Sequence, residues 1–336
     1  MCPEQDRPQD QSQDRPQDQS TWAWDLYWQA DQAGSCAAVD GRGEEASIVD
    51  DWRAFFAGFD DGACLLDIGT GNGAVALIAA EVAAEAGRRF DIHGIDTADI
   101  DPPRFVPARA ELLRTIRFHG RTPAERLPFQ AGTVDGISGQ HALEYTDVDR
   151  SVAELARVLR PGGRVRLVMH ARDSAIVAAN RAKIDHSRYL LGDSGLFAAA
   201  VAVIEAAARA PGGAASPEMA RAAEAFQALR ASAAERLGDG PGRHLLGQIT
   251  GAFDRIYQAR GRYPSDRLTA MIRGVAAQLE AERQRMDALC AAALDEPAAR
   301  RIADLFTSAG CDRPELAAVT AGTGEVIGWR LATAKT

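Results

Sequence analysis

Two carboxylates and three closely spaced glycines carry the strongest chemical signal in this sequence. The stretch from Leu65 to Gly73 reads LLDIGTGNG and leads directly into the apolar helical run AVALIAAEVAA. Glycines allow a left-handed turn and close approach of a ligand, and the amides that begin the next helix point toward that ligand. A second carboxylate, Asp96, lies 25 residues after Gly71, which is close to the spacing of roughly 20 residues at which dinucleotide-binding folds place an acid. The pattern predicts a site for a nucleotide-like ligand.

An alternation of strand and helix patterns has to position these residues. Between Cys64 and His170 the strand-like runs are CLLDIG, FDIHGID, TIRFHG, VDGISG and RVRLVMH, with helical segments between them and a turn at Arg160–Gly163. Alternation of this kind predicts an α/β fold with a parallel, doubly wound sheet that binds ligands at the carboxyl ends of its strands. Because Asp67 and Asp96 both end strands, we expect them at the same edge of the sheet.

The strand pattern stops after His170 for about 125 residues. The segment 172–295 is alanine-rich and helical, with helix starts at Ser216 and Ser265 and a stop at Gly238. We interpret residues 172–295 as a large helical cap inserted after the fifth strand, and we expect a helix and an antiparallel hairpin within residues 296–336 to complete the core.

The beginning of the chain changes character abruptly. Residues 5–12 and 13–20 both read QDRPQDQS, so residues 1–20 are expected to form a disordered low-complexity tail. Residues 21–171 then begin with two aromatic helices, the first of them near Trp22. This first helix either packs on the core or closes over the ligand as a lid, and the sequence leaves both alternatives open.

Composition excludes several classes of protein. A length of 336 residues suggests about two domains, and a net charge of −9 gives no support for a nucleic-acid partner. Five scattered cysteines without CxxC spacing indicate reduced thiols, with neither a disulfide framework nor a zinc site, and we expect no bound metal. Without a secretory signal pattern or an apolar run of about 20 residues, the chain is expected to be soluble and cytoplasmic, with no membrane partner.

Several motifs in the same order resemble those of class I S-adenosylmethionine (SAM)-dependent methyltransferases. The motifs are DIGTGNG, the acid Asp96 after the second strand, LPF before Asp135 at the fourth strand, ARVLRPGG before the fifth, and the closing hairpin. The resemblance covers roughly residues 21–171 and 296–336 and leaves the helical cap uncovered. It implies SAM as cofactor and a Rossmann-like, seven-stranded sheet whose last strand is antiparallel.

The resemblance also implies roles for individual residues. Asp67 would face the ammonium group of SAM, Asp96 would bind the ribose hydroxyls, and Gln140 lies near the methionine end. The complete implied set of cofactor-binding residues is Asp67, Gly69, Gly71, Gly73, Asp96, Glu125, Arg126 and Gln140. One position departs from the family pattern, since Pro123 stands where the family often has an acid that binds adenine.

Two other readings of the glycine turn remain open. The letters GTGNGA also satisfy the dinucleotide pattern G-x-G-x-x-A, which an NAD(P)-dependent oxidoreductase would use. The combination with Asp67, LPF, RPGG and the terminal hairpin favours methyl transfer. A protein that binds SAM without turnover, as a sensor or scaffold, would carry the same residues.

The sequence says less about the methyl acceptor. Methyl transfer is an in-line displacement, so the protein mainly aligns the reactants, and a hydroxyl or protonated amine needs a general base as well. His141 follows the fourth strand and His170 follows the fifth, so these two histidines are the candidate catalytic residues. We expect a small-molecule acceptor, methylated on oxygen first and on nitrogen or carbon second, in a pocket walled by the helical cap. Formation of a homodimer through the helical cap is the alternative role for residues 172–295.

Overall fold

The computed structural model describes residues 21–29, 44–209, 216–320, 324 and 326–336. The predicted low-complexity tail, residues 1–20, lies outside the described residues. The chain divides into two compact units: the first contains the described residues up to Ala178 and from Ala288 onward, and the second contains Ala179–Asp287.

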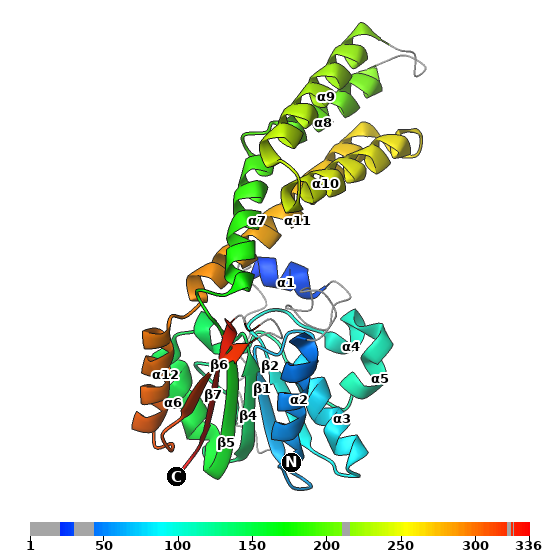
Figure 1. Cartoon of the computed structure of the whole chain (residues 1–336). Coiled ribbons are helices and arrows are strands. Elements are labelled where there is room, and N and C mark those ends of the chain that lie inside the picture. Colours follow the sequence, from blue (N-terminus) through cyan, green and yellow to red (C-terminus); the bar gives the residue numbers. More distant parts are fainter. Residues whose placement is uncertain (1–20, 30–43, 210–215, 321–323, 325) are drawn as a thin grey trace. The chain divides into compact units, whose positions relative to one another are not determined.

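The first unit is built on one seven-stranded sheet in the order β3-β2-β1-β4-β5-β7-β6 (Figure 1). The strands are β1 Cys64–Ile68, β2 Asp91–Ile95, β3 Arg117–His119, β4 Val134–Gln140, β5 Leu159–His170, β6 Glu315–Thr320 and β7 Val326–Ala334. Strands β1 to β5 are parallel, whereas β7 runs antiparallel to both β5 and β6. The predicted doubly wound sheet with an antiparallel last strand is therefore confirmed. The strand order reverses between β1 and β4, which is where such sheets bind ligands.

Helices cover both faces of this sheet. The helices that precede, follow or connect the strands are α1 Trp22–Trp28, α2 Glu44–Ala57, α3 Ala74–Glu85, α4 Pro102–Phe105, η1 Pro107–Arg109, α5 Ala110–Leu113, η2 Leu143–Tyr145, α6 Val148–Val158 and α12 Glu296–Ser308. Figure 1 shows α6 and α12 on one side of the sheet and α2 and α3 on the other. Each face has its own apolar core, with Phe129 and Phe306 in one core and Trp52 and Phe56 in the other. The rigid sandwich fixes the strand ends from which the site is built.

The turn expected at Arg160–Gly163 is instead the beginning of a longer strand. Strand β5 begins at Leu159, and the register between β4 and β5 shifts near Val134. Two backbone hydrogen bonds hold this stretch in the sheet. The Gly162 amide donates to the Lys335 carbonyl, and the Lys335 amide donates to the Gly163 carbonyl. Gly162 keeps a left-handed φ of 73°, so the glycine signal was real while the strand boundary was wrong.

The second unit is helical. Its elements are α8 Leu196–Arg209, α9 Pro217–Leu237, α10 Pro241–Gln258 and η4 Ala259–Gly261, and it contains most of α7 Ala175–Leu191 and α11 Ser265–Ala292. Ser216 caps α9 by accepting a hydrogen bond from the Met219 amide, as expected for a serine at a helix start. Phe226 and Phe253 pack in a separate apolar core. The large helical region after the fifth strand is confirmed, and its role as a cap stays a prediction.

One helical stretch, Ala175–Arg209, is long and apolar enough to cross a membrane by length and composition alone. In the structure it consists of two helices, α7 and α8, that are separated at residues 192–195. Core helices of soluble proteins meet the same criterion, and the expectation of no membrane partner stays a prediction.

The cysteines differ from the expectation in one place. Cys290 and Cys311 are free thiols, but Cys64 at the start of β1 takes part in a disulfide bond. The prediction of reduced thiols is therefore wrong for Cys64. Pairing between cysteines distant in sequence leaves no spacing signature, so the sequence could not have indicated it.

A buried histidine lies between β2 and β3, away from the strand ends. The His93 side chain is fully buried, its Nδ1 lies 2.9 Å from Nε2 of His119, and Arg117 donates to its Nε2 over 3.1 Å. Burial lowers the pKa of the His93 imidazole to about 4. The charges of His119 and Arg117 also lower this pKa, whereas the charge of Asp91 raises it. His93 is therefore neutral in the folded protein at pH values where it is protonated in the unfolded chain.

We expect the free energy of unfolding to decrease as the pH falls from 6.5 to 4, because the unfolded chain binds a proton that folded His93 does not. The contribution of this one group is on the order of 3 kcal/mol at pH 4. Denaturant unfolding of the parent and of His93→Phe at pH 7, 6, 5 and 4 measures it. The difference in stability between the two proteins should shift in favour of the variant at low pH, and a constant difference across the series contradicts the assignment.

Candidate functional site

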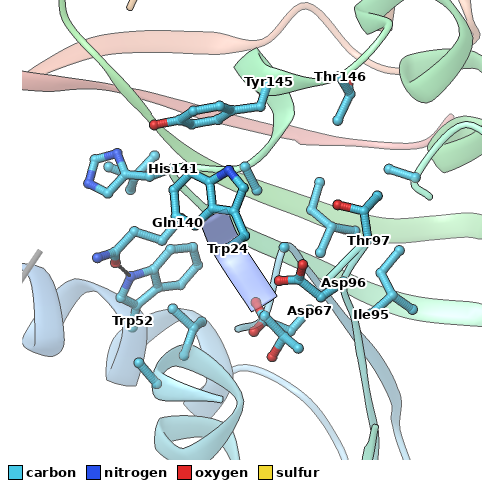
Figure 2. Close-up of a pocket in the computed structure, with 18 of the residues that line it drawn as sticks. Trp24, Trp52, Asp67, Ile95, Asp96, Thr97, Gln140, His141, Tyr145 and Thr146 are labelled. Carbon is cyan, nitrogen blue, oxygen red and sulfur yellow. Dashed lines mark hydrogen bonds between the residues drawn. The ribbon is translucent and has the colours of Figure 1, made fainter. Parts of the chain in front are cut away.

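A cavity of about 400 Å³ lies at the carboxyl ends of β1, β2 and β4. Six predicted site residues line it, namely Asp67, Gly69, Asp96, Glu125, Gln140 and His141. Figure 2 shows the carboxyl groups of Asp67 and Asp96 on one side of this cavity, and Gln140 and His141 on the other. The predicted residues Gly71, Gly73, Arg126 and His170 lie outside the lining, although Gly71 and His170 contact residues within it.

The three glycines of the turn are each required by the backbone. Their φ angles of 56°, 51° and 85° at Gly69, Gly71 and Gly73 are left-handed, a region that side chains disfavour. A Cβ atom on Gly71 would stand 2.3 Å from the ring of Trp28, and one on Gly69 would stand 2.5 Å from Cβ of Ala142. Only glycine lets the turn form with these neighbours in place.

Asp96 joins the ends of β1 and β2. Its Oδ2 accepts the Gly71 amide over 2.9 Å, and its Oδ1 accepts the Ala98 amide over 2.9 Å. Burial raises the pKa of the Asp96 carboxyl above its usual range, although these backbone hydrogen bonds lower it. Each carboxylate oxygen has room for a further donor, so two ribose hydroxyls could be accepted side by side.

Asp67 ends β1 and is almost completely buried. The Ser138 hydroxyl donates to its Oδ1 over 2.8 Å. Burial raises the pKa of the Asp67 carboxyl to about 7, and the nearby Asp96 adds to the increase while hydrogen bonds oppose it. A positively charged ligand group beside Asp67 would reverse this effect, because an opposite charge favours the ionised carboxylate.

The short aromatic helix α1 forms part of the wall. Trp24 and Trp28 line the cavity, and Trp24 meets the Tyr145 ring edge-on at 5.8 Å. The Trp28 carbonyl accepts a hydrogen bond from Asn72, and Asp25 accepts from the Asp99 amide and from Arg121. Helix α1 is thus attached both to the glycine turn and to the loop after β2 and packs on the core, while its closure over a ligand as a lid stays a prediction.

A hydrogen bond between distant residues orients the amide of Gln140. The indole Nε1 of Trp52 donates to Gln140 Oε1 over 2.7 Å (Figure 2). Because the amide oxygen is used in this way, the Gln140 NH₂ group is the part left to donate to a ligand. Trp52 lies on α2, 88 residues before Gln140, and no local pattern in the sequence indicates this pairing.

Glu125 and Arg126 are both in the predicted set of cofactor-binding residues, but they differ in position. Glu125 lines the cavity, and its Oε1 accepts the backbone amide of Asp147, the N-cap residue of α6. Arg126 is exposed and outside the lining.

His141, Glu144 and His170 form a compact group at the ends of β4 and β5. The Glu144 Oε1 accepts both the backbone amide and the Nδ1 hydrogen of His170, each over 2.8 Å. The His141 ring stacks on the His170 ring at a centroid distance of 3.8 Å, and its Nδ1 lies 3.9 Å from the same Oε1. The residues predicted for the site did not include Glu144.

The electrostatics of this group are opposite to those of Asp67. Burial alone raises the pKa of the Glu144 carboxyl, but the hydrogen bonds from His170 and the nearby imidazoles of His141 and His170 outweigh burial and lower the pKa to about 2. Glu144 is therefore ionised at neutral pH. An ionised carboxylate can only accept hydrogen bonds. The contact with Glu144 therefore requires that Nδ1 of His170 carries the hydrogen.

Among the described residues, these three bring their possible metal-ligand atoms within 4.8 Å of one another. A metal bound to imidazole lies in the plane of the ring. The His141 and His170 rings are stacked, with only 28° between their planes. A single metal ion could therefore not lie in the planes of both rings while it contacts a nitrogen atom of each. The present arrangement suits a hydrogen-bonded group better than a metal centre.

Comparison with known proteins identifies the sheet domain. Residues 66–167 match the model of a family described as a methyltransferase domain. Uncharacterized methyltransferases from Mycobacterium bovis and Mycobacterium tuberculosis are each 33% identical over 114 residues, which is 33% of this chain and 42% of theirs. The chain thus matches less than half the length of these relatives.

Solved structures with a related arrangement were also found. The geranyl diphosphate C-methyltransferase of Streptomyces coelicolor A3(2) is 19% identical, with a TM-score of 0.34 over 47% of this chain and 67% of that chain. The 1,6-didemethyltoxoflavin-N1-methyltransferase of Burkholderia thailandensis is 14% identical, with a TM-score of 0.39 over 86% and 79% of the two chains.

The raised pKa of Asp67 predicts that its ionised carboxylate lowers the free energy of unfolding of the ligand-free protein. Since the folded-state pKa is about 7 and the ordinary value is 3.8, stability is lost as the pH rises between these values. This difference corresponds to about 4 kcal/mol. We expect Asp67→Asn to melt several degrees above the parent at pH 8 without ligand, and the advantage to disappear near pH 4. Thermal unfolding at both pH values tests this, and equal melting temperatures at pH 8 would show that Asp67 is not destabilising.

Proposed function

We propose that this chain, whose residues 66–167 match a methyltransferase-domain family, is a class I SAM-dependent methyltransferase that transfers a methyl group from SAM to a small-molecule acceptor. The observation that carries the proposal is the pair of buried carboxylates, Asp67 and Asp96, at the carboxyl edge of the sheet. Both have raised pKa values, so both favour a ligand that brings positive charge and hydroxyl donors. SAM has an ammonium group, a sulfonium and a ribose diol.

The residues that line the cavity fit the parts of this cofactor. Asp96 would accept the ribose hydroxyls, and the Gly69 backbone and Asp67 would face the methionine portion. The oriented NH₂ group of Gln140 is a suitable donor to the methionine carboxylate. Glu125 is the candidate for adenine, whereas the exposed Arg126 is a weaker one. When bound, SAM supplies an electrophilic methyl group on a sulfur that leaves as a thioether.

His141 is the proposed general base. It lines the cavity, whereas His170 lies behind it and is 1% exposed. His141 has a left-handed φ of 57°, an uncommon conformation for a residue with a side chain, and the fold retains this strain at the cavity wall. A hydroxyl acceptor would lose its proton to His141, so oxygen is the first expected methylation site and nitrogen or carbon the second.

The acceptor is expected to be small because the cavity encloses a limited volume. We keep two alternative roles for residues 172–295, acceptor binding and formation of a homodimer. Light scattering of the full chain distinguishes a monomer from a dimer.

Binding of the cofactor can be tested without knowing the acceptor. SAM and S-adenosylhomocysteine should each raise the melting temperature of the parent, whereas NADH and NADPH should leave it unchanged. Asp96→Asn should weaken SAM binding by about 10- to 100-fold, since it replaces a charged acceptor of hydrogen bonds. The matched control Asp239→Asn changes an exposed aspartate of the second unit and should bind SAM normally. Stabilisation by the nicotinamides alone would favour an oxidoreductase instead.

Turnover requires a second test. His141→Asn tolerates the left-handed backbone but has no imidazole. With methyl-labelled SAM and a panel of phenols, amines and enolisable ketones, we expect the variant to lose about 10²- to 10⁴-fold in kcat on hydroxyl acceptors. Its Kd for SAM should stay within twofold of the parent. Full activity in the variant would remove His141 from the mechanism, and a parent that binds SAM but methylates nothing would favour a sensor or scaffold.

A further inference from the structure

Glu144 is a buried carboxylate next to residues that line the cavity. It lies on η2, with its side chain fully buried, and one oxygen, Oε1, receives both hydrogen bonds from His170. The other oxygen, Oε2, is buried without a hydrogen-bond partner among the described residues. Burying an ionised carboxylate costs several kcal/mol unless donors or an opposite charge compensate it. This arrangement therefore calls for a function.

The neighbours of Glu144 are imidazoles. His170 has its Nδ1 hydrogen committed to Oε1, and the tautomer of His170 is thereby fixed. His141 lies flat against His170, with its own Nδ1 3.9 Å from the same oxygen. One carboxylate thus faces two histidines, of which only His141 lines the cavity.

We propose that Glu144 is a positioning residue for methyl transfer, which holds His170 beneath His141 and stabilises the imidazolium that His141 becomes when it takes the proton of the acceptor. This inference rests on the proposed function. In the step itself, the acceptor O–H bond breaks and its proton moves to His141. The oxygen forms a bond to the methyl carbon, and the electron pair of the breaking carbon–sulfur bond stays on sulfur. The proton then passes from His141 to water.

Charge and geometry give Glu144 this role together. An anion about 4 Å from an imidazolium stabilises the charged form, and such a partner commonly raises the pKa of a base by about 1–3 units. The stacked His170 ring limits the orientations that His141 can adopt, so the base is held in place before the acceptor binds. The other titratable groups placed around this pair are Tyr145 on η2, which meets the His170 ring edge-on at 5.9 Å, and His170 itself on β5.

The test is a proton titration of the full chain with S-adenosylhomocysteine bound, which needs no turnover. The chain has six histidines, and loss of one NMR signal in His141→Asn assigns the imidazole of His141. In Glu144→Gln we expect the pKa of His141 to fall by at least about one unit. The matched control is Glu154→Gln, which removes a carboxylate that pairs with Arg157 on α6, and it should leave the titration of His141 unchanged.

Two further measurements separate positioning from simple loss of structure. Glu144→Asp keeps the charge and should recover part of the pKa difference, and Glu144→Gln should bind S-adenosylhomocysteine with the parent Kd. With an acceptor, the acid limb of the kcat profile of Glu144→Gln should move to lower pH, with kcat reduced about tenfold. An unchanged pKa of His141 in Glu144→Gln would overturn the inference. If that pKa falls but the parent methylates nothing, the geometry stands and the proposed function fails.

Discussion

The hydrogen bond from the Gly71 amide to Asp96 is the constraint on which the site depends. It ties the turn after β1 to the end of β2, and it forms only because the glycines adopt left-handed angles. The same turn accommodates the ring of Trp28, so the position of α1 depends on it as well. A side chain at Gly71 would therefore disturb the turn, the carboxylate of Asp96 and the helix over the cavity at once.

The three buried carboxylates at this edge of the sheet differ in how far protein groups compensate their charge. Asp67 and Asp96 have raised pKa values because burial dominates over the few protein donors that reach them. Glu144 is buried to a similar degree but has a lowered pKa, because two histidines lie against it. The Asp67 and Asp96 side of the cavity is thus left to be completed by a ligand, whereas the Glu144 side is completed by the protein. This asymmetry fits the proposed binding of a cationic cofactor beside a group that moves a proton.

The sequence predicted those parts of the structure that local rules determine. The alternation of strands and helices, the glycine turn and the helix start capped by Ser216 follow from periodicity and from single residues with strong preferences. The site was predictable where a residue ends a strand, as Asp67 does. The missing contacts join residues far apart along the chain, such as Trp52 with Gln140 and Glu144 with His170. Such contacts depend on which strands become neighbours and on their register, and neither is encoded in local spacing.

The two candidate bases at the strand ends are not equivalent in the fold. Both follow strands of the same edge, which is why the sequence could not separate them. The His170 imidazole is buried and lies outside the cavity lining, so a ligand in the cavity would meet His141 first. His141 is carried by a strained residue just beyond β4, and it is the ring that reaches the cavity. Because His170 lies at the end of β5, next to β4, its ring packs against His141 instead of facing the cavity.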